Sequence, residues 1–190
     1  MPIVPECPSG SVDRIDLVLP APGQGHDTAV IDLAERLEKG PPLATLVIVG
    51  VDGRFGAPSA AASEWAPLIA AVKAHRGLRI ALIDGPISEA ALDLALAVDL
   101  RLASEAATAE FGPPRDCGRR NELRRLLVAG ALSRVAIDGA AWSAREATAL
   151  GLWDDVMESD DLVEEASVLA GWASDVGARQ VLAARAMLGG

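Results

Sequence analysis

The first hundred residues alternate between short apolar runs and stretches with helical spacing. Ile15, Leu17 and Leu19 recur at every second position, which predicts a strand. The continuous apolar runs over 43–49 and 78–83 are short, rich in branched residues and bounded by turns, as expected of buried parallel strands. Shorter apolar segments at 100–102 and 108–111 predict two further strands. This alternation indicates an α/β fold with a parallel sheet.

Helical periodicity separates the predicted strands and dominates the second half of the chain. The first three helices are expected over 27–38, around Trp65, Leu68, Ile69 and Val72, and over 88–98. Their N-caps would be Asp27 or Thr28, Ser63 and Ser88. Further helices are expected over 119–129, 133–137, 160–174 and 177–187. Ser143 and Glu146 form a capping box that opens another helix, and 152–157 is expected to be a strand or an extended edge.

Composition and charge exclude several classes of function. The 190 residues are 51% hydrophobic, which suffices for a full core, and the net charge is −10, which disfavours nucleic-acid binding. No apolar run is long enough for a membrane span, and the N-terminus does not resemble a signal peptide. Cys7 and Cys117 lie far apart without a partner pattern, so a cytoplasmic location is expected.

General catalytic and nucleotide-binding motifs are absent from the sequence. It contains no P-loop, no G-x-G-x-x-G, no G-x-S-x-G and no H-E-x-x-H. His26 and His75 lie far apart and are interpreted as surface or helix-end residues rather than catalytic bases. The sequence therefore favours neither a triad hydrolase nor a metalloenzyme.

Two ungapped blocks carry a resemblance to a known family. They read DGPISEAALDLALAVDLRLA with ATAEFGPP downstream, and DGAAWSAREA with LGLWDDV downstream. Together they resemble the crotonase, or enoyl-CoA hydratase/isomerase, superfamily. Its members have a G-x-A-x-G-G-G loop before an E-L-A-L-A-C-D-L-R-I-A helix and strand, an A-x-F-G-x-P-E turn, and an L-T-G-x-x-I-S-A-x-E-A segment. The stretch LVIVGVDGRFGAPSA also resembles the family's loop V-V-L-T-G-x-G-R-A-F-C-A-G-A-D.

The resemblance implies a crotonase-like ββα-superhelix core with a parallel sheet, followed by a trimmed C-terminal helical region. Residues 1–12 are then an irregular tail, 13–137 the core, and 138–190 a C-terminal region of the same domain that serves oligomerisation. Family members bind acyl-CoA thioesters and stabilise an enolate with two backbone N–H groups, which here match Ser59 and Ala90. Coenzyme A would be part of the substrate, and no other cofactor is expected.

The proton-transferring carboxylates of the family are matched only in part. Asp93 holds the position of the first glutamate, whereas Arg115 replaces the second and cannot act as a base near neutral pH. Glu89 or Asp116 could supply a substitute carboxylate, although Glu89 also suits a first helical turn. With one carboxylate, double-bond isomerisation, or assisted dehydration or thioester turnover, is easier to support than efficient hydration.

The remaining departures concern the acyl-CoA pocket. The glycine run has become Glu89-Ala90-Ala91, and the loop containing Ala57 has lost the family's aspartate. Arg54 stands where the family often places a basic residue near the nucleotide. Basic residues gather at Arg115, Arg119, Arg120, Arg124 and Arg125. They could hold CoA phosphates or an acidic acyl group, or form a helix face paired with Glu122.

The resemblance thus implies an acyl-CoA-binding enzyme of the isomerase/hydratase type, assembled as a homotrimer or hexamer. A narrower likeness is to small crotonases beside the polyketide synthase that makes dihydroxyphenylacetyl-CoA for glycopeptide antibiotics, which would place it in secondary metabolism with a pathway enzyme as a possible partner. The alternatives are a catalytically inactive crotonase-fold scaffold or partner subunit, and an enzyme acting on a substrate without CoA. No nucleic acid, membrane or metal is expected.

Overall fold

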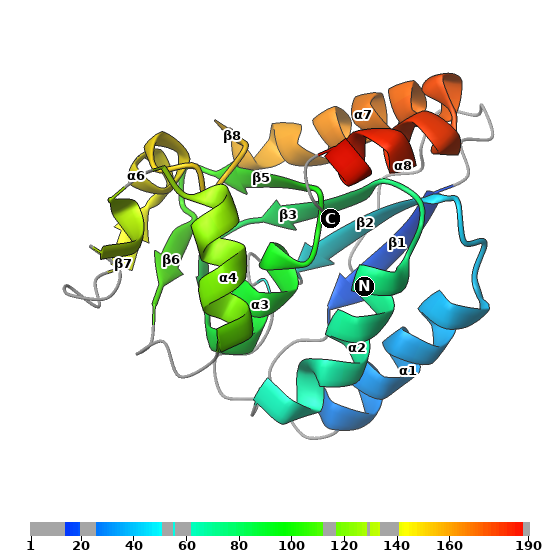
Figure 1. Cartoon of the computed structure of the whole chain (residues 1–190), viewed down its shortest axis with the longest axis horizontal. Coiled ribbons are helices and arrows are strands. Elements are labelled where there is room, and N and C mark those ends of the chain that lie inside the picture. Colours follow the sequence, from blue (N-terminus) through cyan, green and yellow to red (C-terminus); the bar gives the residue numbers. More distant parts are fainter. Residues whose placement is uncertain are drawn as a thin grey trace.

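A five-stranded parallel sheet forms the centre of the molecule in the computed structural model (Figure 1), which describes residues 14–19, 26–50, 55, 62–111, 117–128, 130–133 and 141–187. The strands lie in the order β1-β2-β3-β5-β8, and every neighbouring pair is parallel. Their bounds are β1 Arg14–Leu19, β2 Thr45–Gly50, β3 Arg79–Ile83, β5 Leu100–Ser104 and β8 Asp155–Met157. The predicted parallel sheet is confirmed.

Helices cover both faces of this sheet (Figure 1), which is why the central strands are apolar on both sides. One face packs on α1 (His26–Lys39), α2 (Ala62–Ala74) and α3 (Glu89–Leu96). The other face packs on α7 (Leu162–Val176), which is followed by α8 (Ala178–Met187). In β3, Ala81 and Ile83 face the first layer, whereas Ile80 and Leu82 face α7.

A second, smaller sheet lies beside the first, and its strands lie in the order β4-β6-β7. Its strands are β4 Pro86–Ser88, β6 Thr108–Glu110 and β7 Ala141–Ser143, with β4 parallel and β7 antiparallel to β6. Ile87, Ala109 and Trp142 are its buried residues. Trp142 makes an edge-to-face contact with Phe111 at 4.6 Å between ring centroids, which joins this sheet to the core.

The remaining described elements are short. They are α4 Cys117–Leu126, α6 Ala144–Ala149 and the 3₁₀ helix η1 Ser159–Asp161. The capping box is confirmed, because the Ser143 backbone N–H donates to the Glu146 carboxylate at 3.0 Å while the Ser143 hydroxyl accepts from the Glu146 N–H. Both β7 and β8 come from the region 138–190, so this region contributes a strand to each sheet.

Several predicted boundaries need correction. Ser63 was expected to cap a helix, but α2 begins at Ala62 and contains it. The helix expected over 88–98 ends at Leu96, and the one expected over 119–129 spans Cys117–Leu126. The strands β4 and β7 were not predicted, and most of the helix expected over 133–137 lies outside the described residues.

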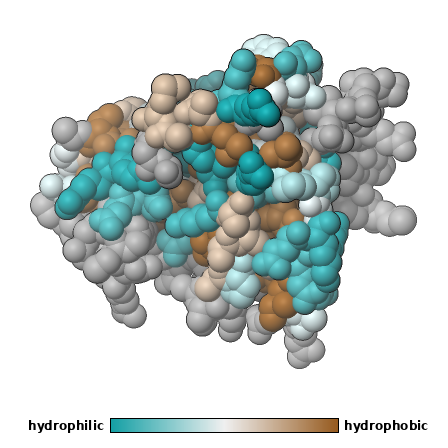
Figure 2. Space-filling view, turned by 45° about the vertical axis from the view of Figure 1, so that its right-hand side comes forward, coloured by the Kyte–Doolittle hydropathy of each residue, from teal (hydrophilic) through white to brown (hydrophobic). Residues whose placement is uncertain are grey.

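The surface is mixed in character. On the face drawn in Figure 2, hydrophobic residues form small groups separated by hydrophilic ones. Within the described ranges, no helix is long and apolar enough to cross a membrane.

Candidate functional site at the start of α3

The start of α3 lies at the carboxyl end of the central sheet. The chain leaves β3 at Ile83, turns at Gly85 and passes through β4 before α3 begins at Glu89. Gly85 has φ +86°, a conformation that favours glycine, and its carbonyl accepts a hydrogen bond from the Thr108 N–H at 3.3 Å. The first N–H groups of α3 therefore lie at the edge where parallel α/β sheets usually bind ligands.

Asp93 lies one turn into this helix. Its side chain is half-buried, while its neighbours Leu92 and Leu94 are fully buried in the core. The carboxylate therefore lies at the margin of an apolar layer, while the backbone that carries it is held in place by the packing of its neighbours. That combination suits a group that exchanges protons with a bound substrate.

A second carboxylate, Asp84, fixes the turn between β3 and α3. Its Oδ1 accepts a hydrogen bond from the Ser104 hydroxyl at 2.6 Å, and its Oδ2 accepts one from the Ser159 hydroxyl at 2.7 Å. Ser104 ends β5 and Ser159 begins η1, so one side chain links three segments at the carboxyl edge of the sheet. We assign Asp84 a positioning role, because both of its oxygens are engaged.

The structure brings together three of the residues predicted for the site. Glu89 and Ala90 are the first two residues of α3, and Asp93 follows on the same helix. The other predicted residues lie outside the described part of the chain. They are Ser59, Arg54, Ala57, Arg115 and Asp116.

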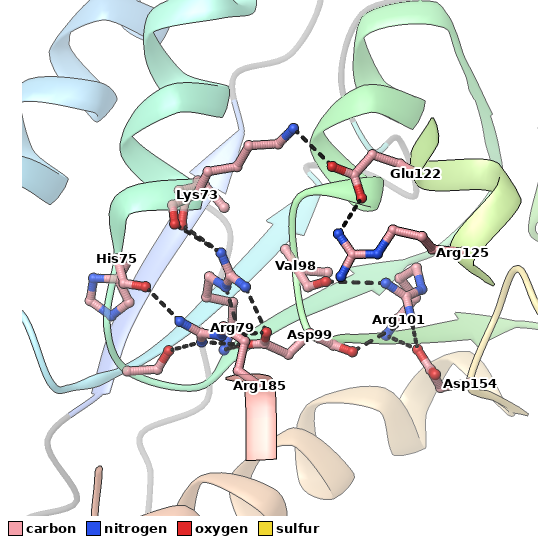
Figure 3. Close-up of polar contacts among 12 residues, drawn as sticks. Lys73, His75, Arg79, Val98, Asp99, Arg101, Glu122, Arg125, Asp154 and Arg185 are labelled. Atoms are coloured by element: carbon pink, nitrogen blue, oxygen red, sulfur yellow. Dashed lines mark hydrogen bonds and ion pairs between the residues drawn. The ribbon is translucent and has the colours of Figure 1, made fainter. Parts of the chain in front are cut away.

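A cluster of ion pairs that the sequence did not predict lies at the opposite, amino end of the sheet (Figure 3). Asp99 accepts hydrogen bonds from Nη2 of Arg79 at 2.6 Å and from Nε of Arg185 at 2.9 Å. Burial raises the pKa of Asp99, but the hydrogen bonds and positive charges of the two arginines outweigh it, so the pKa lies below its usual range. This network anchors α8 to the strands.

Next to it, Arg101 is buried at the start of β5. Its guanidinium donates to the Leu152 and Val98 carbonyls at 3.0 and 3.1 Å and pairs with Asp154 at 2.7 Å. Burial lowers the pKa of Arg101, and the charge of Asp154 opposes that effect. These contacts hold β8 beside β5, which is a structural role.

His75 directly follows α2, as its interpretation as a helix-end residue predicts, but it is buried rather than exposed. Its Nε2 lies 2.7 Å from the Ala44 carbonyl oxygen. Burial lowers the pKa of His75, and the charges of Arg79 and Arg185 add to this effect, while the contact with Ala44 opposes it. His75 therefore belongs with Arg79, Asp99 and Arg185 to a cluster at the amino end of the sheet, the amino-end cluster, which has a structural role.

The predicted pairing of the α4 arginines with Glu122 is confirmed for one of them. Arg125 approaches Glu122 at 3.7 Å, and Lys73 of α2 donates to the same carboxylate at 3.3 Å (Figure 3). Arg124 is exposed on the same helix. Among the described residues, no group of three or more His, Cys, Asp or Glu side chains could hold a metal ion.

The two sheets, the helical layers and the turn into α3 define the crotonase fold. A protein assigned to the enoyl-CoA hydratase/isomerase family from Hyphomonas neptunium superimposes with a TM-score of 0.79 at 24% identity, over 95% of this chain and 79% of that chain. An enoyl-CoA hydratase/carnithine racemase from Magnetospirillum magneticum gives a TM-score of 0.76 at 20% identity, over 94% and 78% of the two chains.

A monofunctional enoyl-CoA isomerase from M. smegmatis also superimposes with a TM-score of 0.76, at 18% identity over 93% of this chain and 87% of that one. Neither a protein-family model nor a curated protein matches the sequence. The likeness to these structures therefore rests on the fold.

Proposed function

We propose that this protein binds an acyl-CoA thioester and stabilises its enolate at the start of α3. The observation that carries the proposal is the position of Asp93, a half-buried carboxylate one turn beyond the helix N-terminus at the carboxyl edge of the sheet. The similarity of the fold to enoyl-CoA hydratase/isomerase family proteins supports it.

The chemistry follows from the charge that develops during enolisation. Asp93 removes a proton from the carbon next to the thioester, and the electron pair moves onto the thioester oxygen. The N–H of Ala90 and the helix dipole stabilise that oxygen, with the N–H of Ser59 as the second donor that the resemblance implies. In a thioester with a double bond between the β- and γ-carbons, Asp93 returns the proton to the γ-carbon. The double bond then moves to the α,β position, and the carboxylate is regenerated.

Isomerisation is the reaction that one carboxylate supports best. Asp93 takes and returns the same proton, so the cycle balances without another base. Hydration also requires a group that activates water, and Arg115 stands where the family has its second glutamate. We therefore propose enolate chemistry of the isomerase type.

A direct test measures enolate formation without knowledge of the natural acyl group. Phenylacetyl-CoA is incubated with the protein in D₂O, and loss of the α-proton signal is followed by NMR. Asp93→Asn should slow the exchange by about 10²–10⁴-fold, whereas Glu110→Gln, an exposed carboxylate on β6, should leave it unchanged. Exchange by Asp93→Asn at the wild-type rate would remove Asp93 from the mechanism.

Binding is measured separately by calorimetric titration with CoA, crotonyl-CoA and phenylacetyl-CoA. A dissociation constant in the micromolar range, equivalent to about −8 kcal/mol, supports a thioester pocket. If folded protein binds none of the three, the acyl-CoA proposal fails. The alternative of a scaffold or partner subunit, motivated by the replacement of the glycine run and by Arg115, would then be favoured.

A further inference from the structure

Helix α7 carries a second apolar stripe on the side that faces away from the sheet. Its inner residues Leu162, Ala166 and Ala170 are buried. Val168, Trp172 and Val176 also recur at four-residue spacing, but they are 40, 60 and 49% exposed. The inner stripe thus packs in the core. The outer stripe of Val168, Trp172 and Val176 forms a ridge that extends about 12 Å along the helix.

Trp172 is the exposed member of the four tryptophans, since Trp65, Trp142 and Trp153 are buried. Tryptophan is among the residue types that most often anchor protein interfaces, and here it lies in a row with two exposed valines. The stripe is therefore suited to a protein partner.

Within the segment that carries the stripe, the charges have one sign. From residue 159 to 176 the chain contains five acidic residues and no lysine or arginine; these are Asp160, Asp161, Glu164, Glu165 and Asp175. Throughout this described segment, none of the five takes part in an ion pair. Four of them are exposed, and Glu165 is half-buried.

We propose that the outer face of α7 is a docking surface for a basic amphipathic helix of another protein. The apolar ridge matches the groove between side chains of a second helix, and the uncompensated carboxylates attract lysines or arginines at its margins. A contact in which two copies meet through their α7 helices is disfavoured, because it would place five more acidic residues against these five, on molecules that each carry a net charge of −10.

Docking on α7 does not compete with chemistry at α3. The two helices pack on opposite faces of the central sheet, α3 against Ala81 and Ile83, and α7 against Ile80 and Leu82. The proposal therefore does not depend on the proposed acyl-CoA activity.

The probe is a synthetic 14-residue helical peptide that has leucines on one face and lysines on the other. Its counterpart has glutamate in place of every lysine. The fluorescence of Trp172 reports binding, because its emission should shift to shorter wavelength when a partner covers the ring. We expect the lysine peptide to bind in the micromolar range at 50 mM salt, to weaken about tenfold or more at 500 mM, and the glutamate peptide not to bind.

Two matched variants separate a docking site from general attraction to an acidic protein, with affinities measured by calorimetry. Glu164→Gln/Glu165→Gln/Asp175→Asn should weaken the lysine peptide at least tenfold. Asp32→Asn/Glu35→Gln/Glu38→Gln on α1 changes the net charge equally and should change affinity less than twofold. Equal weakening by both triple variants would overturn the proposal.

A pair of apolar variants tests the ridge. Trp172→Ala should weaken the peptide about tenfold, whereas Ile31→Ala, which removes a 47% exposed residue from α1, should not. Unchanged binding by Trp172→Ala would overturn the proposal. Sedimentation equilibrium gives the remaining outcome: an oligomer of the wild-type chain that Trp172→Ala dissociates would assign the stripe to a second copy instead.

Discussion

Replacing Asp99 with asparagine should destabilise the protein by about 3 kcal/mol. The carboxylate accepts five hydrogen bonds, three from Arg79 and two from Arg185, at 2.5 to 3.1 Å. The Arg79 and Arg185 side chains are only 9 and 17% exposed, so water cannot replace the lost partner fully. Because the Asp99 side chain is itself 19% exposed, the expected cost lies at the lower end of the range for buried ion pairs, about 3–5 kcal/mol.

The assay is urea unfolding, followed by the fluorescence of the buried tryptophans. With a denaturant dependence of about 2 kcal/mol per molar urea, the midpoint should fall by roughly 1.5 M. Asp16→Asn is the matched control. It breaks an aspartate–arginine pair of the same 2.6 Å length, but Asp16 is 37% exposed, so the expected cost is below about 1 kcal/mol.

The same variant should also change the response to acid. The pKa of Asp99 is lowered in the folded state, so its contribution is present above the unfolded pKa of about 3.9 and is lost as the pH falls through the lower folded value. Asp99→Asn should therefore lose less stability than the wild type below about pH 4. Equal midpoint shifts for Asp99→Asn and Asp16→Asn at pH 7 would refute the reasoning, since burial would then contribute nothing.

Three further predictions concern burial and backbone geometry. The pKa of His75 is lowered in the folded state, so as the pH falls the unfolded chain takes up a proton before the folded chain does. Stability is therefore lost as the pH falls through about 6.5. Between pH 8 and pH 5, the urea midpoint of His75→Gln should change less than that of the wild type, and His26→Gln is the control. Gly77→Ala should destabilise the protein strongly, because the added Cβ would lie 1.9 Å from a backbone oxygen. Gly171→Ala should stabilise it by up to about 1 kcal/mol, since Gly171 is inside α7 with open space around it. In thermal unfolding, the first variant should lower the Tm and the second should raise it. Trp142→Ala should cost about 3–5 kcal/mol in the urea assay, because it opens a cavity in the core beneath the small sheet.

Local periodicity explains why much of the fold could be predicted. The strands β2 and β3 are buried on both faces, and the capping box at Ser143 is complete within four residues. The strands β4 and β7 were missed because three residues are too few to show an alternation. Both are defined by pairing with β6, a contact that no local pattern contains.

The candidate site was predictable only where residues lie close in sequence. Glu89, Ala90 and Asp93 share one helix, so a motif sufficed to place them together. In the amino-end cluster, Arg79 begins β3 and Asp99 immediately precedes the parallel strand β5, so the two could have been paired from that alignment. The third member, Arg185, comes from the last helix, 86 residues beyond Asp99, and no spacing in the sequence indicates it.

The proposed site at the start of α3 and the proposed docking surface on the outer face of α7 require different properties of the chain. The proposed enolate chemistry requires close approach of a thioester to the start of α3. The family resemblance matches Ala90 and Ala91 there to glycines, and Ala91 is 1% exposed. Alanine favours helix formation more than glycine does, but a Cβ adds bulk where the proposed enolate chemistry needs close approach. The outer face of α7 is independent of that compromise, because the central sheet separates it from α3. A chain that had lost activity at α3 would therefore still bind a basic helix at α7, and the two properties can be measured on the same protein.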